Sequence, residues 1–182
     1  MGLMTTLPFG RALTRADLAE LPDDGHRYEL IDGSLVVSPS PPYGHQVAVG
    51  NLFGVLRAAC PPGLQVILAP FAVALADDTE VQPDLLVAPT EQFTDKELPG
   101  PPLLAIEVLS PSTRRVDLLL KRDRLQAAGV PSYWLVDPDL LTVTVLELRD
   151  GVYEEVAVIG EGEEREVLRP FPVRIVPARL RD

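Results

Sequence analysis

The sequence predicts an α/β (α+β) domain in which a mixed β-sheet is flanked by helices and extended by β-hairpins. Three observations predict this class. Short apolar runs rich in branched residues alternate with amphipathic stretches long enough for helices. Proline, glycine and aspartate separate the runs, as is typical of turns. The run at residues 103–109, bounded by prolines and charged only at Glu107, has the pattern of a strand buried on both faces.

The N-terminal part predicts a short helix, a hairpin and a longer helix. Thr14, with Asp17 three residues on, forms a capping box for a helix that ends before Pro22. An Asp-Gly pair inside residues 26–42 joins two apolar runs into a hairpin. Residues 44–60 carry apolar side chains at three- and four-residue intervals, which predicts an amphipathic helix.

Strands dominate the rest of the chain. Apolar runs at 64–68, 71–75 and 84–88 lead into the strand that contains Glu107. A helix over about residues 114–128 follows, with hydroxyl caps in the sequence SPST before it. Two strands then cover 132–138 and 141–148, with Tyr133 and Trp134 expected in the core and Asp137 expected in the turn between them. The tail, 152–159 and 165–176, is predicted to pair as one more hairpin.

Length and composition indicate a single domain over residues 1–182. With 46% hydrophobic and 24% charged residues the chain resembles an ordinary globular protein, and no apolar run approaches the roughly 18 to 20 residues of a membrane span. We therefore expect no membrane association. The start of the chain lacks the basic and apolar regions of a secretory signal, and its single cysteine allows no internal disulfide. A cytoplasmic location is expected.

The net charge of −11 argues against a large basic nucleic-acid footprint. The distribution is uneven, however, because five of the 16 basic residues fall within positions 114–124. A locally positive site on an acidic protein is therefore compatible with the sequence.

Glu107 is the residue that most needs an explanation. An ionised carboxylate in a doubly buried strand costs several kcal/mol, a large part of a typical domain's stability of about 5–15 kcal/mol. Three arrangements compensate such a group: protonation, a buried cationic partner, or a metal ion. The residues alone leave these alternatives open.

A second carboxylate is expected beside Glu107. Asp84 begins one strand and Glu107 lies near the end of the next long one, so antiparallel pairing would place the two side by side. Two such carboxylates repel unless one is protonated or a cation lies between them. Oxygen ligands of this kind suit Mg²⁺, with Mn²⁺ as a substitute.

Lys121 is the third candidate. It lies four residues after Asp117 on the predicted helix, and it is one of only two lysines against fourteen arginines. A helix packed on the sheet could bring its amine near Glu107, where a shiftable point charge suits contact with an attacking water. The alternative is a solvated Asp117/Lys121 surface pair, which is common at this spacing.

The sequence also resembles a known family. Pro83-Asp84, "IEVLSPST" with Asp117 and Lys121, "AGV", "YWLVDP" and the opening "RYELIDGSLVVSPSP" followed by His45 are similar to the Uma-type family of bacterial restriction endonucleases in the PD-(D/E)XK nuclease superfamily, over roughly residues 12–147. The resemblance implies a restriction-endonuclease-like core and Mg²⁺-dependent hydrolysis of DNA. It also implies that Glu29 lines the site, with a hairpin pairing role as its alternative. The superfamily's strand lysine is replaced by Leu109, and Lys121 is the implied substitute.

The leading hypothesis is a metal-dependent endonuclease. Asp84 and Glu107 would hold the metal, and Lys121 and Glu29 would complete the catalytic site. Arg114, Arg115 and His45 would contact the DNA substrate. The rivals are a nuclease-fold module that binds nucleic acid without turnover and a metal-dependent hydrolase of smaller substrates. The resemblance also suggests a homodimer.

Overall fold

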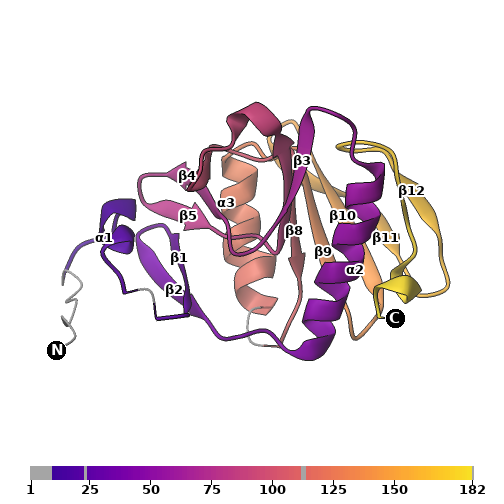
Figure 1. Cartoon of the computed structure of the whole chain (residues 1–182), viewed down its shortest axis with the longest axis horizontal. Helices are drawn as coiled ribbons and strands as arrows, with labels where there is room; N and C mark the ends of the chain where they lie inside the picture. Colours follow the sequence, from indigo (N-terminus) through magenta and orange to yellow (C-terminus); the bar gives the residue numbers. More distant parts are fainter. Residues whose placement is uncertain (1–9, 23, 112–113, 182) are drawn as a thin grey trace.

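The fold is described from a computed structural model, which covers residues 10–22, 24–111 and 114–181. Its centre is a six-stranded mixed sheet in the order β11-β10-β9-β8-β6-β3 (Figure 1). The strands are β3 (Leu64–Leu68), β6 (Leu85–Pro89), β8 (Leu104–Val108), β9 (Ser132–Asp137), β10 (Thr142–Arg149) and β11 (Val152–Ile159). Only β8 and β9 run parallel within this sheet; its other neighbours are antiparallel. The predicted mixed sheet is therefore confirmed.

A second, five-stranded sheet lies on the N-terminal side of the molecule, in the order β2-β1-β5-β4-β7. Its strands are β1 (Arg27–Ile31), β2 (Ser34–Ser38), β4 (Ala72–Ala76), β5 (Thr79–Val81) and β7 (Glu97–Pro99). The predicted hairpin is confirmed: Asp32 and Gly33 both have positive φ, at 51° and 70°. A Cβ at Gly33 would lie 2.5 Å from the Ala12 Cβ, so the chain also needs glycine there for space.

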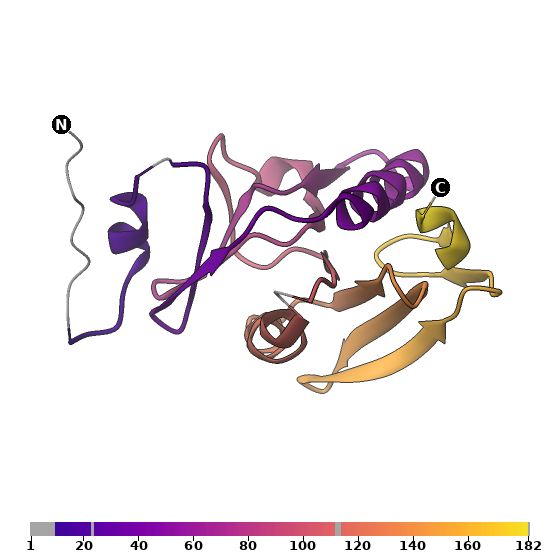
Figure 2. The ribbon, with the colours of Figure 1, turned by 90° about the horizontal axis from the view of Figure 1, so that it is seen from below.

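Helices cover both faces of the six-stranded sheet (Figure 2). The helical elements are α1 (Arg15–Ala19), α2 (Tyr43–Ala59), the 3₁₀ turns η1 (Thr90–Gln92) and η3 (Pro177–Leu180), the π-helix η2 (Val116–Lys121) and α3 (Arg122–Ala127). The apolar stripe of α2 packs on one face of the sheet, together with Leu104, Ile106 and Val108. Leu125 of α3 and the five-stranded sheet pack on the other face with Ala105 and Leu109.

The helix predictions hold well. α1 carries the expected capping box between Thr14 and Asp17, and α2 begins and ends within one residue of its predicted bounds. The third helix begins at residue 114 as predicted, but its first full turn is a π-helix. Its expected caps include Ser112 and Thr113, which lie outside the described residues.

The strand pairing differs from the prediction in two places. The run at 71–75 joins the second sheet with β5 and β7, two short strands whose apolar runs are too brief to signal them. In the tail, β11 pairs with β10 and not with the C-terminal segment, because Asp150 and Gly151 both have positive φ and form a tight turn. The C-terminal segment folds on itself as β12 (Arg165–Val167) and β13 (Val173–Ile175).

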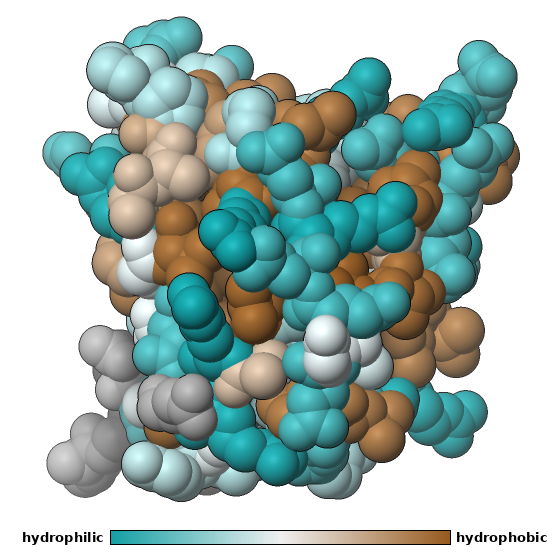
Figure 3. Space-filling view, turned by 90° about the vertical axis from the view of Figure 1, so that its right-hand side faces the viewer, coloured by the Kyte–Doolittle hydropathy of each residue, from teal (hydrophilic) through white to brown (hydrophobic). Residues whose placement is uncertain are grey.

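The C-terminal hairpin closes the core beside α2. Ile175 and Leu180 are buried in the same apolar cluster as Leu52 and Leu56. Figure 3, which views this side of the molecule, shows apolar side chains gathered between hydrophilic ones. Among the described residues, no helix has both the length and the apolar character needed to cross a bilayer.

Candidate active site

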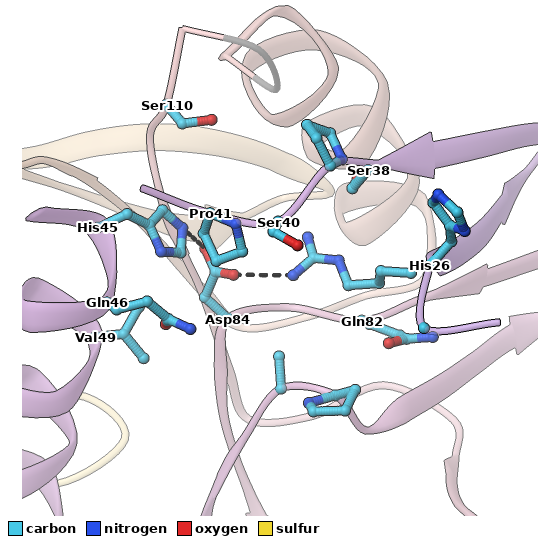
Figure 4. Close-up of a pocket in the computed structure, with 15 residues that line it drawn as sticks. His26, Ser38, Ser40, Pro41, His45, Gln46, Val49, Gln82, Asp84 and Ser110 are labelled. Atoms are coloured by element: carbon cyan, nitrogen blue, oxygen red, sulfur yellow. Dashed lines mark hydrogen bonds and ion pairs between the residues drawn. The ribbon is translucent and has the colours of Figure 1, made fainter. Parts of the chain in front are cut away.

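The candidate site lies where the two sheets and the start of α2 meet. A pocket of about 400 Å³ opens there. Its lining comes from segments far apart in the sequence, among them the start of β1, the end of β2, the first turn of α2 and the segment before β6, and includes Arg27, Ser38, His45, Gln82, Asp84 and Ser110 (Figure 4). Two of the predicted site residues, Asp84 and His45, thus line one pocket.

Asp84 and Glu107 lie opposite each other. In the antiparallel ladder of β6 and β8, Leu85 pairs with Ile106, so the next step of the register places Asp84 across from Glu107. Opposed residues in such a pair project from the same face. The backbone N–H of Val108 donates to Asp84 Oδ2 at 2.9 Å, which fixes the Asp84 carboxylate against the end of β8.

Two further groups hold Asp84. Arg27 donates from Nη1 to Asp84 Oδ1 at 3.0 Å, and His45 Nε2 lies 3.1 Å from Oδ2. Burial disfavours the charged carboxylate, but the contacts with His45, Arg27 and Val108 outweigh it and lower the pKa of Asp84 to about 2. Because Asp84 is ionised and only accepts, His45 Nε2 carries the proton of this hydrogen bond.

Glu107 has a cationic partner inside the protein. Lys121 Nζ donates to Glu107 Oε1 at 2.8 Å, and both residues are 1% exposed. Burial is the main cause that raises the pKa of Glu107 well above its usual value; Lys121 opposes this, and Asp117, Asp84 and Glu29 add to it. Of the three compensations left open by the sequence, the described residues thus provide a buried cation.

Lys121 contacts three carboxylates. Besides Glu107, its Nζ lies 2.9 Å from Glu29 Oε1 and 3.6 Å from Asp117 Oδ1. Burial alone would lower the pKa of Lys121, but Glu107, Glu29 and Asp117 outweigh it and raise that pKa. The expectation that Lys121 points toward Glu107 is confirmed, and the solvated surface pair is wrong because Asp117 and Lys121 are both 1% exposed.

The π-helix places Lys121. Tyr133, fully buried on β9, donates from its hydroxyl to the Asp117 carbonyl oxygen at 2.9 Å and ties the helix to the sheet. Leu119 and Leu120 remain largely exposed while Asp117 and Lys121 turn inward. Single π turns inside α-helices are rare and are frequent at functional sites.

Glu29 lies in the same cluster, as the resemblance implied. It is fully buried on β1, accepts from the Gln82 backbone N–H at 2.6 Å through Oε1 and contacts Lys121 through the same oxygen. Glu29 also has its predicted hairpin position, opposite Val36 of β2. The two interpretations of Glu29 are therefore compatible.

The predicted phosphate contacts lie outside this cluster. Arg114 and Arg115 are exposed at the start of the helical segment. Arg114 donates from Nη1 to Asp137 Oδ2 at 2.7 Å. Asp137 also accepts from the backbone N–H groups of Asp139 and Leu140, which confirms its predicted turn role.

Sequence reasoning missed Arg27 and Gln82. Arg27 pairs with both Asp84 and Glu29, yet in the sequence it is an ordinary charged residue at the start of a strand. Gln82 contacts β1 by donating a hydrogen bond from Nε2 to the Tyr28 carbonyl oxygen. The one signal in the sequence was their location two positions before a predicted site residue: Arg27 before Glu29, and Gln82 before Asp84.

The cluster carries more negative than positive charge. Four carboxylates, those of Glu29, Asp84, Glu107 and Asp117, surround two permanent cations. With all four ionised and His45 neutral, the formal charge is −2. A buried surplus of this size is costly, and either protonation of Glu107 or a divalent cation would relieve it.

Asp84 and Glu107 are the candidate ligands for a magnesium ion. Asp84 and Glu107 supply two opposed carboxylates, and Mg²⁺ typically takes one or two and keeps several waters. Within the described ranges, no group of three or more histidine, cysteine or acidic side chains is placed so that it could hold a metal ion. A magnesium ion held here would take at most these two carboxylates from the protein and would complete its shell with water and substrate.

Three comparisons with known proteins bear on the identity of the chain. No curated protein matches it. A crystal structure described as "a putative nuclease belonging to DUF820 from Anabaena variabilis" has 21% sequence identity and a TM-score of 0.73, covering 92% of this chain and 97% of that one. At this identity the match shows a shared fold. Residues 15–179 match the model of the Uma2 family, described as "Putative restriction endonuclease", and the chain therefore belongs to that family.

Proposed function

We propose that the protein is a Mg²⁺-dependent endonuclease that hydrolyses DNA phosphodiester bonds. One observation carries the proposal: Asp84 and Glu107 lie opposite each other on one sheet face, and a fully buried lysine contacts the second of them at 2.8 Å. Membership of the family supports a nuclease activity in particular.

Asp84 and Glu107 would hold the metal ion. When bound, the ion would supply a water of lowered pKa and polarise the scissile phosphate. Glu29 and Asp117 would keep Lys121 charged and in place, so that its ammonium stabilises negative charge that develops beside Glu107. His45 would orient Asp84 through Nε2 and face the substrate from the first turn of α2. Arg114 and Arg115 would contact flanking phosphates.

A second candidate is a nuclease-fold module that binds nucleic acid without cleaving it. Its support is that Asp84 and Glu107 each already have a cation, Arg27 and Lys121. Its further support is that the strand position of the superfamily lysine holds Leu109. Either protein would work in the cytoplasm, and we propose a homodimer for both, to be checked by sedimentation.

Cleavage assays with matched variants test the proposal. Circular and linear DNA would be incubated with Mg²⁺, Mn²⁺ or EDTA and the wild-type protein, Asp84→Asn, Glu107→Gln or Glu154→Gln. Glu154 is the control because it is an acid, 57% exposed and paired with Arg149, on the edge strand β11, which two strands separate from β8. Nicking or linearisation that needs the divalent ion and disappears only in the first two variants supports the endonuclease. DNA binding by all variants without any cleavage supports the module instead.

A further inference from the structure

Arg27 has a position that the proposed function leaves unused. It begins β1, lines the pocket and is 22% exposed at its side chain. Its guanidinium lies between two carboxylates, with Nη1 3.0 Å from Asp84 Oδ1 and Nη2 3.6 Å from Glu29 Oε2. The pKa of Arg27 is raised, because Glu29, Glu107 and Asp84 outweigh the effect of burial. Arg27 is thus a permanent cation at the mouth of the acidic cluster.

The oxygen that Arg27 contacts is the one a metal ion would need. A carboxylate oxygen has two lone pairs. Asp84 Oδ2 uses both, for the Val108 N–H at 2.9 Å and for His45 Nε2 at 3.1 Å. Asp84 Oδ1 accepts from Arg27. A divalent ion that binds Asp84 therefore approaches the oxygen held by Arg27 and meets its positive charge there.

Arg27 is held less firmly than Lys121. Its Nε is buried and has no hydrogen-bond partner among the described residues, and its contact with Glu29 is longer than a hydrogen bond. It therefore makes one hydrogen bond to Asp84, at 3.0 Å, in place of the two parallel bonds of a bidentate pair. Lys121, by contrast, is 1% exposed and has two carboxylate oxygens within 2.9 Å. Of the two cations, Arg27 is the one able to leave, and the pocket gives it space.

We propose that Arg27 is an exchangeable counter-cation: it occupies Asp84 Oδ1 in the metal-free protein, yields that oxygen to the divalent ion, and then binds a phosphate of the nucleic-acid substrate in the pocket. The inference deepens the proposed function and rests on Asp84 as a metal ligand. A guanidinium suits this transfer, because its planar fork matches carboxylate and phosphate oxygens alike.

The metal arm of the test needs no catalysis. Mn²⁺ binding would be measured by calorimetry for the wild type, Arg27→Met, Arg27→Lys and the control Arg124→Met. Arg124 is a suitable control because it also pairs with an aspartate, Asp32 at 3.0 Å, at an exposed position. Removing a positive charge beside the ligand oxygen should tighten Mn²⁺ binding at least about tenfold in Arg27→Met. Arg27→Lys, which keeps the charge, and Arg124→Met should stay within about threefold of the wild type.

The phosphate arm uses a labelled duplex oligonucleotide with Ca²⁺ in place of Mg²⁺, so that binding is measured by anisotropy without turnover. Arg27→Met should weaken oligonucleotide binding about tenfold or more, and Arg27→Lys should weaken it less. A loss in oligonucleotide affinity together with a gain in Mn²⁺ affinity is the signature of exchange. A purely structural arginine would lower both affinities or neither, and either of those results overturns the inference.

The inference and the proposed function fail in different ways. If the wild type cleaves DNA but Arg27→Met leaves Mn²⁺ affinity unchanged or weaker, the counter-cation inference is wrong and the nuclease stands. If no variant cleaves DNA yet Arg27→Met binds Mn²⁺ more tightly, the exchange stands and the endonuclease is wrong. Should Arg27→Met fail to fold by circular dichroism, Arg27→Gln removes the same charge and carries the same expectation.

Discussion

Lys121 Nζ lies 2.8 Å from Glu107 and 2.9 Å from Glu29, so a single buried ammonium serves two fully buried carboxylates, with Asp117 at 3.6 Å as a third. The arrangement is asymmetric. The three carboxylates share the lysine. Among the described residues, Lys121 is the one cation paired with Glu107, whereas Glu29 also has Arg27 at 3.6 Å. Stability should therefore respond very differently to the loss of the cation and to the loss of one anion.

We predict that Lys121→Met destabilises the protein by about 3–5 kcal/mol, because it leaves buried carboxylates without their cation. Glu107→Gln should cost less than about 1.5 kcal/mol, since Lys121 keeps Glu29 and Asp117 as partners. Urea denaturation of both variants measures the difference. Equal losses would contradict the shared-cation arrangement.

Mn²⁺ should stabilise the wild-type protein by mass action, by about 2.7 kcal/mol at one hundred times its dissociation constant. Asp84→Asn should fold and lose most of this stabilisation, because Asp84 is one of the two opposed carboxylates. Thermal melts with and without Mn²⁺ test this. The exposed Glu154→Gln variant should keep the full response; a response that survives in Asp84→Asn places the metal elsewhere.

The stability of the protein should depend on pH through the ionisation of Glu107. Its pKa in the folded protein is raised well above the ordinary 4.5, chiefly by burial, so the folded state holds the proton more tightly than the unfolded chain. The contribution of Glu107 to the free energy of unfolding is fully present below about pH 4.5, and it is lost as the pH rises through the pKa of Glu107 in the folded protein. Glu107→Gln stays neutral and escapes this loss. Melting temperatures of the wild type relative to Glu107→Gln should therefore fall as the pH increases from 4.5.

Arg114 should matter for DNA and hardly for folding. Its side chain is 47% exposed, so its ion pair with Asp137 is expected to contribute less than about 1 kcal/mol. If Arg114 and Arg115 contact phosphates, the double change to alanine should weaken DNA binding and reduce the slope of affinity against salt by up to about two. Anisotropy titrations at several salt concentrations measure both. An unchanged slope would exclude the pair from the DNA interface.

Tyr133→Phe tests the link between the sheet and the π-helix. It removes the hydroxyl that donates to the Asp117 carbonyl oxygen and should cost about 1 kcal/mol of unfolding free energy. Because this bond anchors the turn that carries Lys121, DNA cleavage should fall as well. The phenylalanine variant of Tyr153, which donates to the Val130 carbonyl oxygen and lies beside Tyr133, is the matched control. It should lose similar stability and keep its cleavage rate.

Local signals in the sequence were enough for much of the fold and for the acidic pair. The two-residue period of each strand is a local property, so the buried run around Glu107 and the strand start at Asp84 were recognisable, and the antiparallel pairing expected from them is present. The position of β4 in a separate sheet depends on partners β5 and β7, which have three residues each. Such short strands form only in the folded context and leave no periodic trace in the sequence.

The site shows the same division. Glu107 was recognisable because a charge in an apolar run contradicts its surroundings, and Lys121 because lysine is rare in this chain. Arg27 gave no comparable signal, because an arginine at the start of a strand is common in the sequences of ordinary proteins. Its role depends on Asp84, which is 57 positions away in the sequence, and only the tertiary structure brings the two together.

The π-helix at Val116–Lys121 restricts how many residues can lie between Asp117 and Lys121, the residue at which it ends. One residue removed from this turn, for example the exposed Leu119, would let the segment wind as a regular α-helix, where each residue advances about 100°. The deletion would also reduce the separation of Asp117 and Lys121 from four residues to three. The contact of Lys121 Nζ with Asp117 and the hydrogen bond from Tyr133 to the Asp117 carbonyl oxygen could then not both keep their present geometry. Insertions and deletions in this segment should therefore be much less tolerated than substitutions at the same exposed positions.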